Sequence, residues 1–249
     1  MNPSPIFISM RTASAAIVIT FFLGVCAAKF VAGIRRKAWK MILDGILTLP
    51  LVLPPTVAGF FLLYIFGVRG PAGFFFLHFF SVRIAFSWEA TVLAAVAVSF
   101  PLMYRSARGA LEQVDSNIIY AARTLGMSEW SIFRTVTLPT ALPGVASGGV
   151  LAFARGLGEF GATAMIAGNI AGKTRTLPLA IYSAVAGGDM DAAYGYVLII
   201  VIFSFVVVAL MNFFTVQNSY SGIKDSYSGI KDFRIGIQHS RNKRGGYEP

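Results

Sequence analysis

The chain has 249 residues, of which 56% are hydrophobic and only 13% are charged. Soluble domains carry about 25% charged residues, so this composition excludes an ordinary water-soluble enzyme and predicts an all-α integral membrane protein. A formal net charge of +10 would suggest nucleic-acid binding in a soluble protein. In a membrane protein it indicates cytoplasmic loops rich in Lys and Arg, so no nucleic-acid partner is expected. The single Cys26 cannot form an intramolecular disulfide, and His78 and His239 are too few and too far apart for a metal cluster.

Five apolar segments are long enough to cross a membrane, which takes about 20 residues in a helix. In chain order they are residues 12–34, 42–66, 88–104, 142–166 and 193–214. The second contains Pro50, Pro54 and Pro55, so we expect it to be kinked or partly unwound there. The N-terminal residues MNPSPIFISM lack the basic region of a cleaved signal peptide, and the apolar run after Arg11 is long enough to span.

Two further apolar stretches are too short to span. Residues 67–87 contain GPAGFFFLHFF, whose Gly and Pro residues favour a helix that lies at the membrane surface. Residues 167–192 contain a short apolar piece, 177–186, which is typical of a re-entrant or interfacial helix.

A polar stretch, YAARTLGMSEWSIFRTVTLP at residues 120–139, separates the third and fourth segments. It predicts two short helices joined by Gly126, which should take the left-handed conformation that ends the first helix. The first helix is marked by an apolar stripe of Ile118, Ala122 and Leu125. Ser128 is predicted to cap the second helix.

The second of these helices has a small apolar face made by Ile132, Phe133 and Val136. Leu138-Pro139 is expected to end it, because proline cannot continue a helix interior. A rigid helix–Gly–helix elbow between membrane spans needs a partner outside the membrane to press against.

The spacing of Ala121-Ala122, Gly126, Val136 and Leu138-Pro139 resembles the EAA loop of ABC-importer permeases, the element that docks into the cytoplasmic ATPase. Tyr120 stands where that family usually has Glu. The resemblance implies a coupling loop at residues 115–140. Its ATPase-coupling residues are Tyr120, Ala121, Ala122, Gly126, Val136, Leu138 and Pro139.

If this loop is cytoplasmic, five spans place the N-terminus outside and the C-terminus inside. Fifteen of the 21 Lys and Arg residues then lie inside, five lie outside and Arg155 lies in the membrane. Basic residues gather on the cytoplasmic side of membrane proteins, so the asymmetry agrees with this orientation.

The fourth segment carries a ridge of small residues and a pair of charges. Small residues recur every four positions and allow close helix packing; they are Gly144, Gly148, Ala152 and Gly156. Arg155 and Glu159 are also four apart and are expected to share the adjoining strip of the same helix. A charged side chain inside a membrane-spanning segment should face the interior of the helix bundle and have a partner there. The pair either fastens helices together or lines the translocation pathway or its gate.

Residues 167–174, AGNIAGKT, resemble a phosphate-binding loop with Ala in place of its first Gly. Such a loop needs a preceding buried strand, whereas an apolar membrane segment precedes this one. Nucleotide binding is therefore not expected here, and neither a catalytic triad nor a carboxylate pair suggests catalysis.

Longer phrases extend the resemblance over residues 6–214; among them are LPLVLPPTVAGFFLL, FSWEATVLAAVAVSFPLMYRSARGAL, LPTALPG, LAFARGLGEFGA and GKTRTLPLAIY. Together they are similar to the molybdate permease subunits of type I ABC importers. The resemblance implies a permease domain with five transmembrane helices and a cytoplasmic coupling helix, located in the inner membrane in contact with lipid. It also implies a second copy of the chain, two ATPase subunits that use ATP and Mg, and a periplasmic oxyanion-binding protein. The chain itself would be a transport subunit without a cofactor.

Other functions remain open from the sequence. A sulfate, thiosulfate or tungstate permease would look much the same, because these oxyanions share shape and charge. A secondary transporter often shows two related halves, and the membrane segments here show no internal repeat; a channel would work as a lone chain. A non-transporting scaffold would need no coupling loop. Residues 215–249, in which SYSGIKD occurs twice in tandem, are predicted to form a flexible basic cytoplasmic tail.

Overall fold

The computed structural model describes residues 2–34 and 36–211, and within those ranges every regular element is a helix, as predicted. The predicted tail at residues 215–249 lies outside the described residues. The elements in chain order are α1 (Ser4–Ala32), α2 (Lys37–Val52), α3 (Pro55–Phe66), α4 (Pro71–Phe80), α5 (Trp88–Glu112), α6 (Ser116–Thr124), α7 (Glu129–Ile132), the π-helical turn η1 (Phe133–Thr137), α8 (Leu138–Leu157), α9 (Gly161–Ile166), α10 (Leu177–Ala186) and a final helix Met190–Met211.

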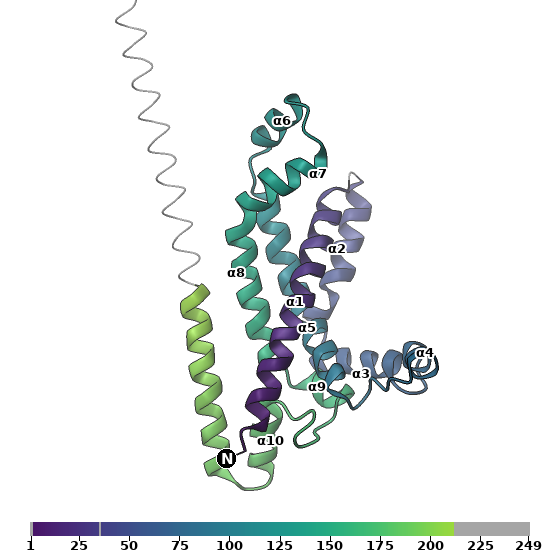
Figure 1. Cartoon of the computed structure of the whole chain (residues 1–249), viewed down its shortest axis with the longest axis vertical. Coiled ribbons are helices and arrows are strands. Elements are labelled where there is room, and N and C mark those ends of the chain that lie inside the picture. The colour runs from purple at the N-terminus through teal and green to yellow at the C-terminus, as the bar shows by residue number, and fades with distance from the viewer. Residues whose placement is uncertain (1, 35, 212–249) are drawn as a thin grey trace, which may run out of the picture.

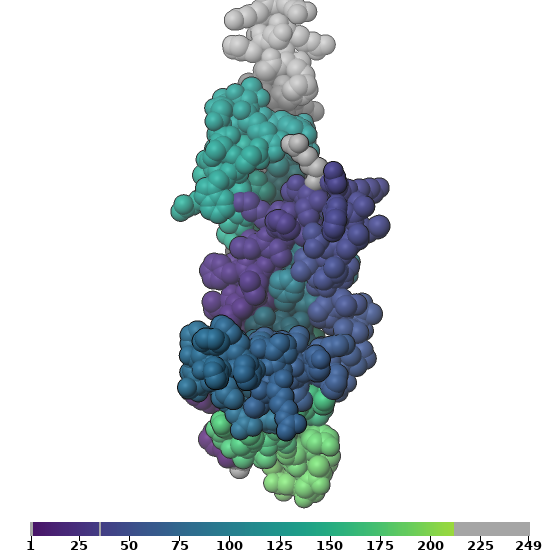
Figure 2. All heavy atoms as spheres, turned by 90° about the vertical axis from the view of Figure 1, so that its right-hand side faces the viewer, coloured from purple at the N-terminus to yellow at the C-terminus, as the bar shows by residue number. Residues whose placement is uncertain are grey.

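The long helices lie side by side in an elongated bundle (Figure 1). α6 and α7 form one end of it, and the N-terminus, α10 and the start of the final helix lie at the other. α3 and α4 project sideways near that second end, and Figure 2 faces the side from which they project.

The core lies where α1, α5 and α8 meet, and small residues bring their backbones together. A Cβ added at Gly24 of α1 would lie 2.6 Å from Met103 Cγ of α5. A Cβ at Gly144 of α8 would lie 2.8 Å from Ala110 Cβ, and one at Gly148 would collide with Ser106 Cβ. Ala152 is buried in the same cluster, and Gly156 faces Ala95. The ridge of small residues in α8 therefore lies along α5.

Four helices are long and apolar enough to cross a membrane within the described residues: Ser4–Ala32, Trp88–Glu112, Glu129–Leu157 and Met190–Met211. The pair α2–α3 makes a fifth if it counts as one broken span. Large apolar side chains are exposed on these helices, among them Phe22, Phe30, Leu198 and Phe205. Such side chains suit a lipid environment, and the chain is an integral membrane protein.

The proline-rich break in the second segment is confirmed, and it is sharper than a kink. α2 ends at Val52 and α3 begins at Pro55, with 109° between the two axes. Leu53 is extended, at φ −68° and ψ 140°, because the residue before a proline is pushed out of the helical region. Pro54, which itself precedes Pro55, is extended for the same reason, at ψ 135°. Both short apolar stretches form helices, α4 and α10.

Two predicted helix ends are wrong. The fourth segment was expected to be one helix through residue 166, but α8 ends at Leu157 and α9 is a separate helix after a break at residues 158–160. Leu138-Pro139 was expected to end a helix, but the helix Glu129–Leu157 continues through it. The wider turn η1 comes just before Pro139. A π-helical turn changes the hydrogen-bond pattern where proline lacks an N–H, so the chain stays helical.

Candidate functional site

The elbow, defined here as α6, the turn at Gly126, α7 and η1, forms the tip of the bundle (Figure 1). Asp115 caps α6 by accepting a 2.8 Å hydrogen bond from the Asn117 N–H. Gly126 has φ +79°, which confirms the predicted left-handed conformation. The Met127 N–H donates to the Ala122 carbonyl and the Gly126 N–H to the Arg123 carbonyl, at 3.2 and 2.9 Å. These two bonds form a Schellman motif, so the turn is closed by its own backbone.

Side chains on both sides of Gly126 fix the angle of the elbow. The Ser128 hydroxyl accepts from the Ser131 N–H at 3.2 Å and caps α7, as predicted. The Arg123 guanidinium binds both carboxylate oxygens of Glu129, at 2.6 and 3.1 Å. The hydrogen bond to Glu129 raises the pKa of Arg123, and a two-point contact of this kind is geometrically specific. The elbow is thus held across Gly126 by an ion pair as well as by the backbone.

The outer face of the elbow is apolar and exposed. Tyr120 is 59% exposed, Leu125 82% and Trp130 63%. The predicted stripe of Ile118, Ala122 and Leu125 is therefore only partly internal: Ala122 is buried, but Ile118 and Leu125 face outward. The sequence pattern marked a helix correctly, but two of its three apolar side chains are exposed among the residues that the structure describes.

The remaining residues predicted for the coupling surface lie along the elbow and its junction with α8. Ala121 is exposed on α6, while Val136 and Leu138 are half-buried. Pro139 is exposed at the start of α8. The structure thus places all seven on the elbow or at the first residues of α8, with Leu125 and Trp130 the most exposed large apolar side chains nearby.

Arg155 and Glu159 do form an ion pair, with Arg155 Nη1 2.8 Å from Glu159 Oε2. The expectation that both share one helix is wrong, because α8 ends at Leu157 and Glu159 lies in the break before α9. The other oxygen of Glu159, Oε1, accepts a 2.7 Å hydrogen bond from the Ala162 N–H in the first turn of α9. Glu159 is 2% exposed, whereas the Arg155 side chain is 33% exposed. One partner is therefore sealed in the protein, and the other reaches its surface.

A family model described as "Binding-protein-dependent transport system inner membrane component" matches residues 7–217. The chain belongs to this family. Among its relatives, "Molybdenum transport system permease protein ModB" of Escherichia coli (strain K12) is 45% identical over 190 residues, which is 76% of this chain and 82% of that protein. "Putative molybdenum transport system permease protein YvgM" of Bacillus subtilis (strain 168) is 41% identical over 217 residues, which is 86% of this chain and 92% of that protein.

Solved structures with the same fold include ABC importers. An inward-facing form of the MetNI methionine ABC transporter aligns with a TM-score of 0.62 at 16% identity, covering 84% of this chain and 94% of that one. A bacterial alginate ABC transporter in complex with its pentasaccharide-bound periplasmic protein aligns with a TM-score of 0.65 at 14% identity, covering 84% of this chain and 76% of that one. At these identities the likeness concerns the fold of the permease.

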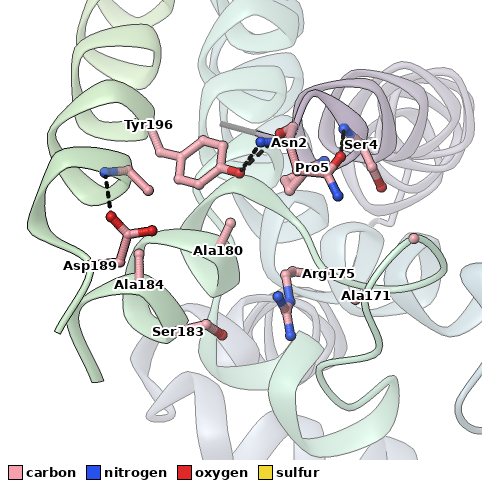
Figure 3. A pocket seen from close by; sticks show the side chains of 12 residues that line it. Asn2, Ser4, Pro5, Ala171, Arg175, Ala180, Ser183, Ala184, Asp189 and Tyr196 are labelled. Carbon is pink, nitrogen blue, oxygen red and sulfur yellow. Dashed lines mark hydrogen bonds between the residues drawn. The ribbon is translucent and has the colours of Figure 1, made fainter. Parts of the chain in front are cut away.

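The end of the permease opposite the elbow carries a polar cavity of about 360 Å³. Figure 3 shows the side chains of Arg175, Ser183 and Asp189 around it. The Tyr196 hydroxyl accepts from the Asn2 N–H at 3.2 Å and donates to the Asn2 carbonyl at 2.9 Å, which joins the N-terminus to the final helix. The loop that resembles a phosphate-binding loop forms one wall with Ala171 and Gly172, and it follows the helix α9 where a nucleotide site would need a strand.

A charged cluster between α2 and α5 was missed by the sequence analysis of this permease. Arg108 of α5 pairs with Asp44 of α2, and Tyr104 donates a 2.9 Å hydrogen bond to the same carboxylate. Glu112 accepts from Arg108 at 3.0 Å and pairs with Lys40 at 2.9 Å. The signal was present: an acid such as Asp44 in an otherwise apolar segment calls for a partner.

Proposed function

We propose that this chain is the membrane-spanning permease subunit of an ATP-driven importer that moves molybdate across the cytoplasmic membrane. The observation that carries the proposal is the 45% identity with a molybdenum transport permease over 76% of the chain. The exposed elbow supports it, because a permease without an ATPase of its own needs a surface through which one can act.

The proposed topology has five crossings, with the N-terminus outside and the C-terminus inside, and the broken pair α2–α3 counts as one crossing. The elbow and the N-terminus lie at opposite ends of the bundle (Figure 1), so an elbow in the cytoplasm places the N-terminus outside. The excess of Lys and Arg on the elbow side of the membrane agrees with this orientation.

The proposed assembly contains two copies of this chain, two cytoplasmic ATPase subunits that use ATP and Mg, and an oxyanion-binding protein outside the membrane. The elbow would dock into the ATPase through Tyr120, Leu125 and their neighbours, whose apolar area is exposed in this chain. The opposite end, with the cavity at Arg175, would face the binding protein. Alternating access would then move the oxyanion through a pore between the two copies.

Arg155 and Glu159 are proposed to line the translocation pathway or its gate. The Arg155 side chain is one-third exposed and uses Nη1 on Glu159. The planar guanidinium has further N–H donors that suit oxyanions. Glu159, sealed at 2% exposure, would hold the guanidinium in place.

The test is uptake into proteoliposomes that contain this chain, its cognate ATPase and its binding protein. We expect ATP-dependent accumulation of labelled molybdate that excess unlabelled molybdate abolishes and excess sulfate lowers only slightly. Sulfate that competes as well as or better than unlabelled molybdate at the same concentration would make the chain a sulfate permease. Uptake by this chain without ATPase or ATP would make it a channel or a secondary transporter.

A further inference from the structure

A lysine near the cytoplasmic end of α1 contacts the elbow through two aromatic rings. Lys29 Nζ lies 3.9 Å from the ring centroid of Trp130 and 3.8 Å from that of Phe133. The two rings are three residues apart on one helical face, with centroids 5.9 Å apart and planes inclined by 29°. An ammonium within about 6 Å of an aromatic face is attracted to it, and here one ammonium meets two faces.

The charge of Lys29 has no carboxylate partner within the described residues. Glu129, the acid next to Trp130 in the elbow, accepts hydrogen bonds from Arg123 through both of its carboxylate oxygens. Lys29 also lies in the last turn of α1, where the helix dipole favours a cation. The rings and the helix end are therefore what stabilises this cation, and the contact is specific to the elbow.

A pocket that the described side chains leave open lies beside this contact. A cavity of about 310 Å³ lies between the elbow and the spans, bounded by Lys29, Gly33, Leu111, Ile119 and Phe133. The elbow also touches the bundle directly, because Phe133 packs against the buried cluster shared by α1, α5 and α8. Beside this packing, the Lys29 side chain adds a contact from α1 to the rings of Trp130 and Phe133.

Phe133 is also the first residue of the π-helical turn η1, the last part of the elbow before α8. Turns of this kind often mark functional sites inside helices. A push on the elbow could therefore be absorbed by a change in η1 before it reaches α8. A contact that holds Phe133 against α1 opposes that change.

We infer that Lys29 is a positioning residue for coupling: it ties the elbow to α1 through Trp130 and Phe133, so that movement of the elbow reaches both α1 and α8. This inference rests on the proposed function. Without the tie the elbow would stay docked on the ATPase, but η1 would yield and ATP would be hydrolysed with less transport.

The first experiment measures oxyanion moved per ATP hydrolysed in proteoliposomes of the complete transporter. Lys29→Met keeps the apolar stem and removes the charge; we expect normal association with the ATPase and a fall in the ratio of about fivefold, the population change produced by one cation–π contact of ordinary strength. Lys29→Arg keeps a cation over the rings and should restore most of the ratio. The matched control is Lys37→Met, an exposed lysine at the start of α2, which should leave the ratio unchanged.

A double-mutant cycle tests whether the effect passes through the ring. Phe133→Leu should lower the ratio by itself, and the combination with Lys29→Met should be no worse than the more severe single variant, because Lys29→Met already removes the ammonium that contacts the Phe133 ring. Additive losses would overturn the inference. So would a wild-type ratio in Lys29→Met, or loss of ATPase association by that variant.

The contact itself can be checked without transport. In a chain whose only tryptophan is Trp130 (Trp39→Phe and Trp88→Phe), Lys29→Met should change the emission of Trp130, and Lys29→Arg should not. If the wild-type complex moves no oxyanion, the proposed function fails. The emission of Trp130 then still tests whether Lys29 contacts the elbow. Unchanged emission in Lys29→Met would refute it.

Discussion

In the Arg155–Glu159 pair, replacing Arg155 should destabilise the protein more than replacing Glu159. In Arg155→Met, the carboxylate of Glu159 stays 2% exposed and keeps, among the described residues, only the Ala162 N–H as a partner. Removal of one member of a buried ion pair costs about 3 to 5 kcal/mol. In Glu159→Gln, the amide oxygen can still accept from Ala162, and the freed guanidinium is 33% exposed, so it can be hydrated. We expect about 1.5 to 3 kcal/mol there, the cost of a hydrogen bond to a charged group.

The double variant Arg155→Met with Glu159→Gln removes both charges and keeps the cap on α9. It should therefore recover folded yield nearly to that of the wild type, since replacing a buried ion pair by neutral groups of similar size is often neutral. Folded yield and thermal unfolding of the purified complex measure this order: wild type and double variant above Glu159→Gln, and Arg155→Met lowest. An Arg155→Met variant as stable as the wild type would show that the structural reasoning is wrong.

Transport separates the two roles that remain open for the pair. If Arg155 lines the pathway, the double variant should assemble with its ATPase yet take up at least about tenfold less oxyanion per complex, which corresponds to the loss of about 1.4 kcal/mol of transition-state or binding interaction. Arg155→Lys, which keeps the charge but loses the planar fork, should fall between. Wild-type uptake by the neutral double variant would reduce the pair to a fastener between helices.

Three other predictions follow from single positions. Gly126→Val places a β-branched residue at φ +79°, which costs about 1 to 3 kcal/mol of local strain; we expect normal membrane insertion and weakened co-purification with the ATPase, and undiminished uptake would show that the elbow does not couple. Gly148→Ala would drive a methyl group into Ser106 Cβ and should lower the stability of the α5–α8 contact by about 1 to 3 kcal/mol, measured by thermal unfolding, whereas Gly109→Ala, with nothing within 4 Å, should not. In a Cys26→Ser background, a cysteine in place of Arg123 should be shielded from impermeant thiol reagents in intact cells and one in place of Lys173 should be labelled; labelling at position 123 would invert the proposed topology.

Local chemistry explains which features could be predicted from the sequence. Gly126, Ser128 and the prolines at 54 and 55 act on the backbone within a few residues of themselves, so their effects need no knowledge of the rest of the fold. The apolar segments predicted four long helices in their order for the same reason, and the other predicted span is the broken pair α2–α3. The mostly apolar run from 142 to 166 misled the prediction of its end, because neither Gly158 nor Glu159 stops a helix by its own propensity alone.

The contacts that depend on distant partners could not be predicted. Asp44 needed a cation, but Lys40, Arg105 and Arg108 were all candidates, and only the packing of α2 against α5 selects Arg108 and, through it, Glu112. Lys29 was counted as one more basic residue on the cytoplasmic side. Its neighbours Trp130 and Phe133 lie about a hundred residues further along the chain, and nothing in its local sequence indicates them.

Because of the break between α8 and α9, the Arg155–Glu159 ion pair connects two separate helices. Arg155 lies on the continuous helix Glu129–Leu157, whose other end is the elbow. Glu159 caps α9, and α9 packs closely on α3: a Cβ at Gly59 would lie 2.6 Å from Ala162 Cα, and one at Gly161 would lie 3.1 Å from Pro55 Cβ. One partner therefore belongs to the helix that leads to the elbow, and the other to a unit anchored at the proline break. A displacement of the elbow that reaches α8 would strain or open the pair, which is why loss of both charges should impair transport without impairing assembly.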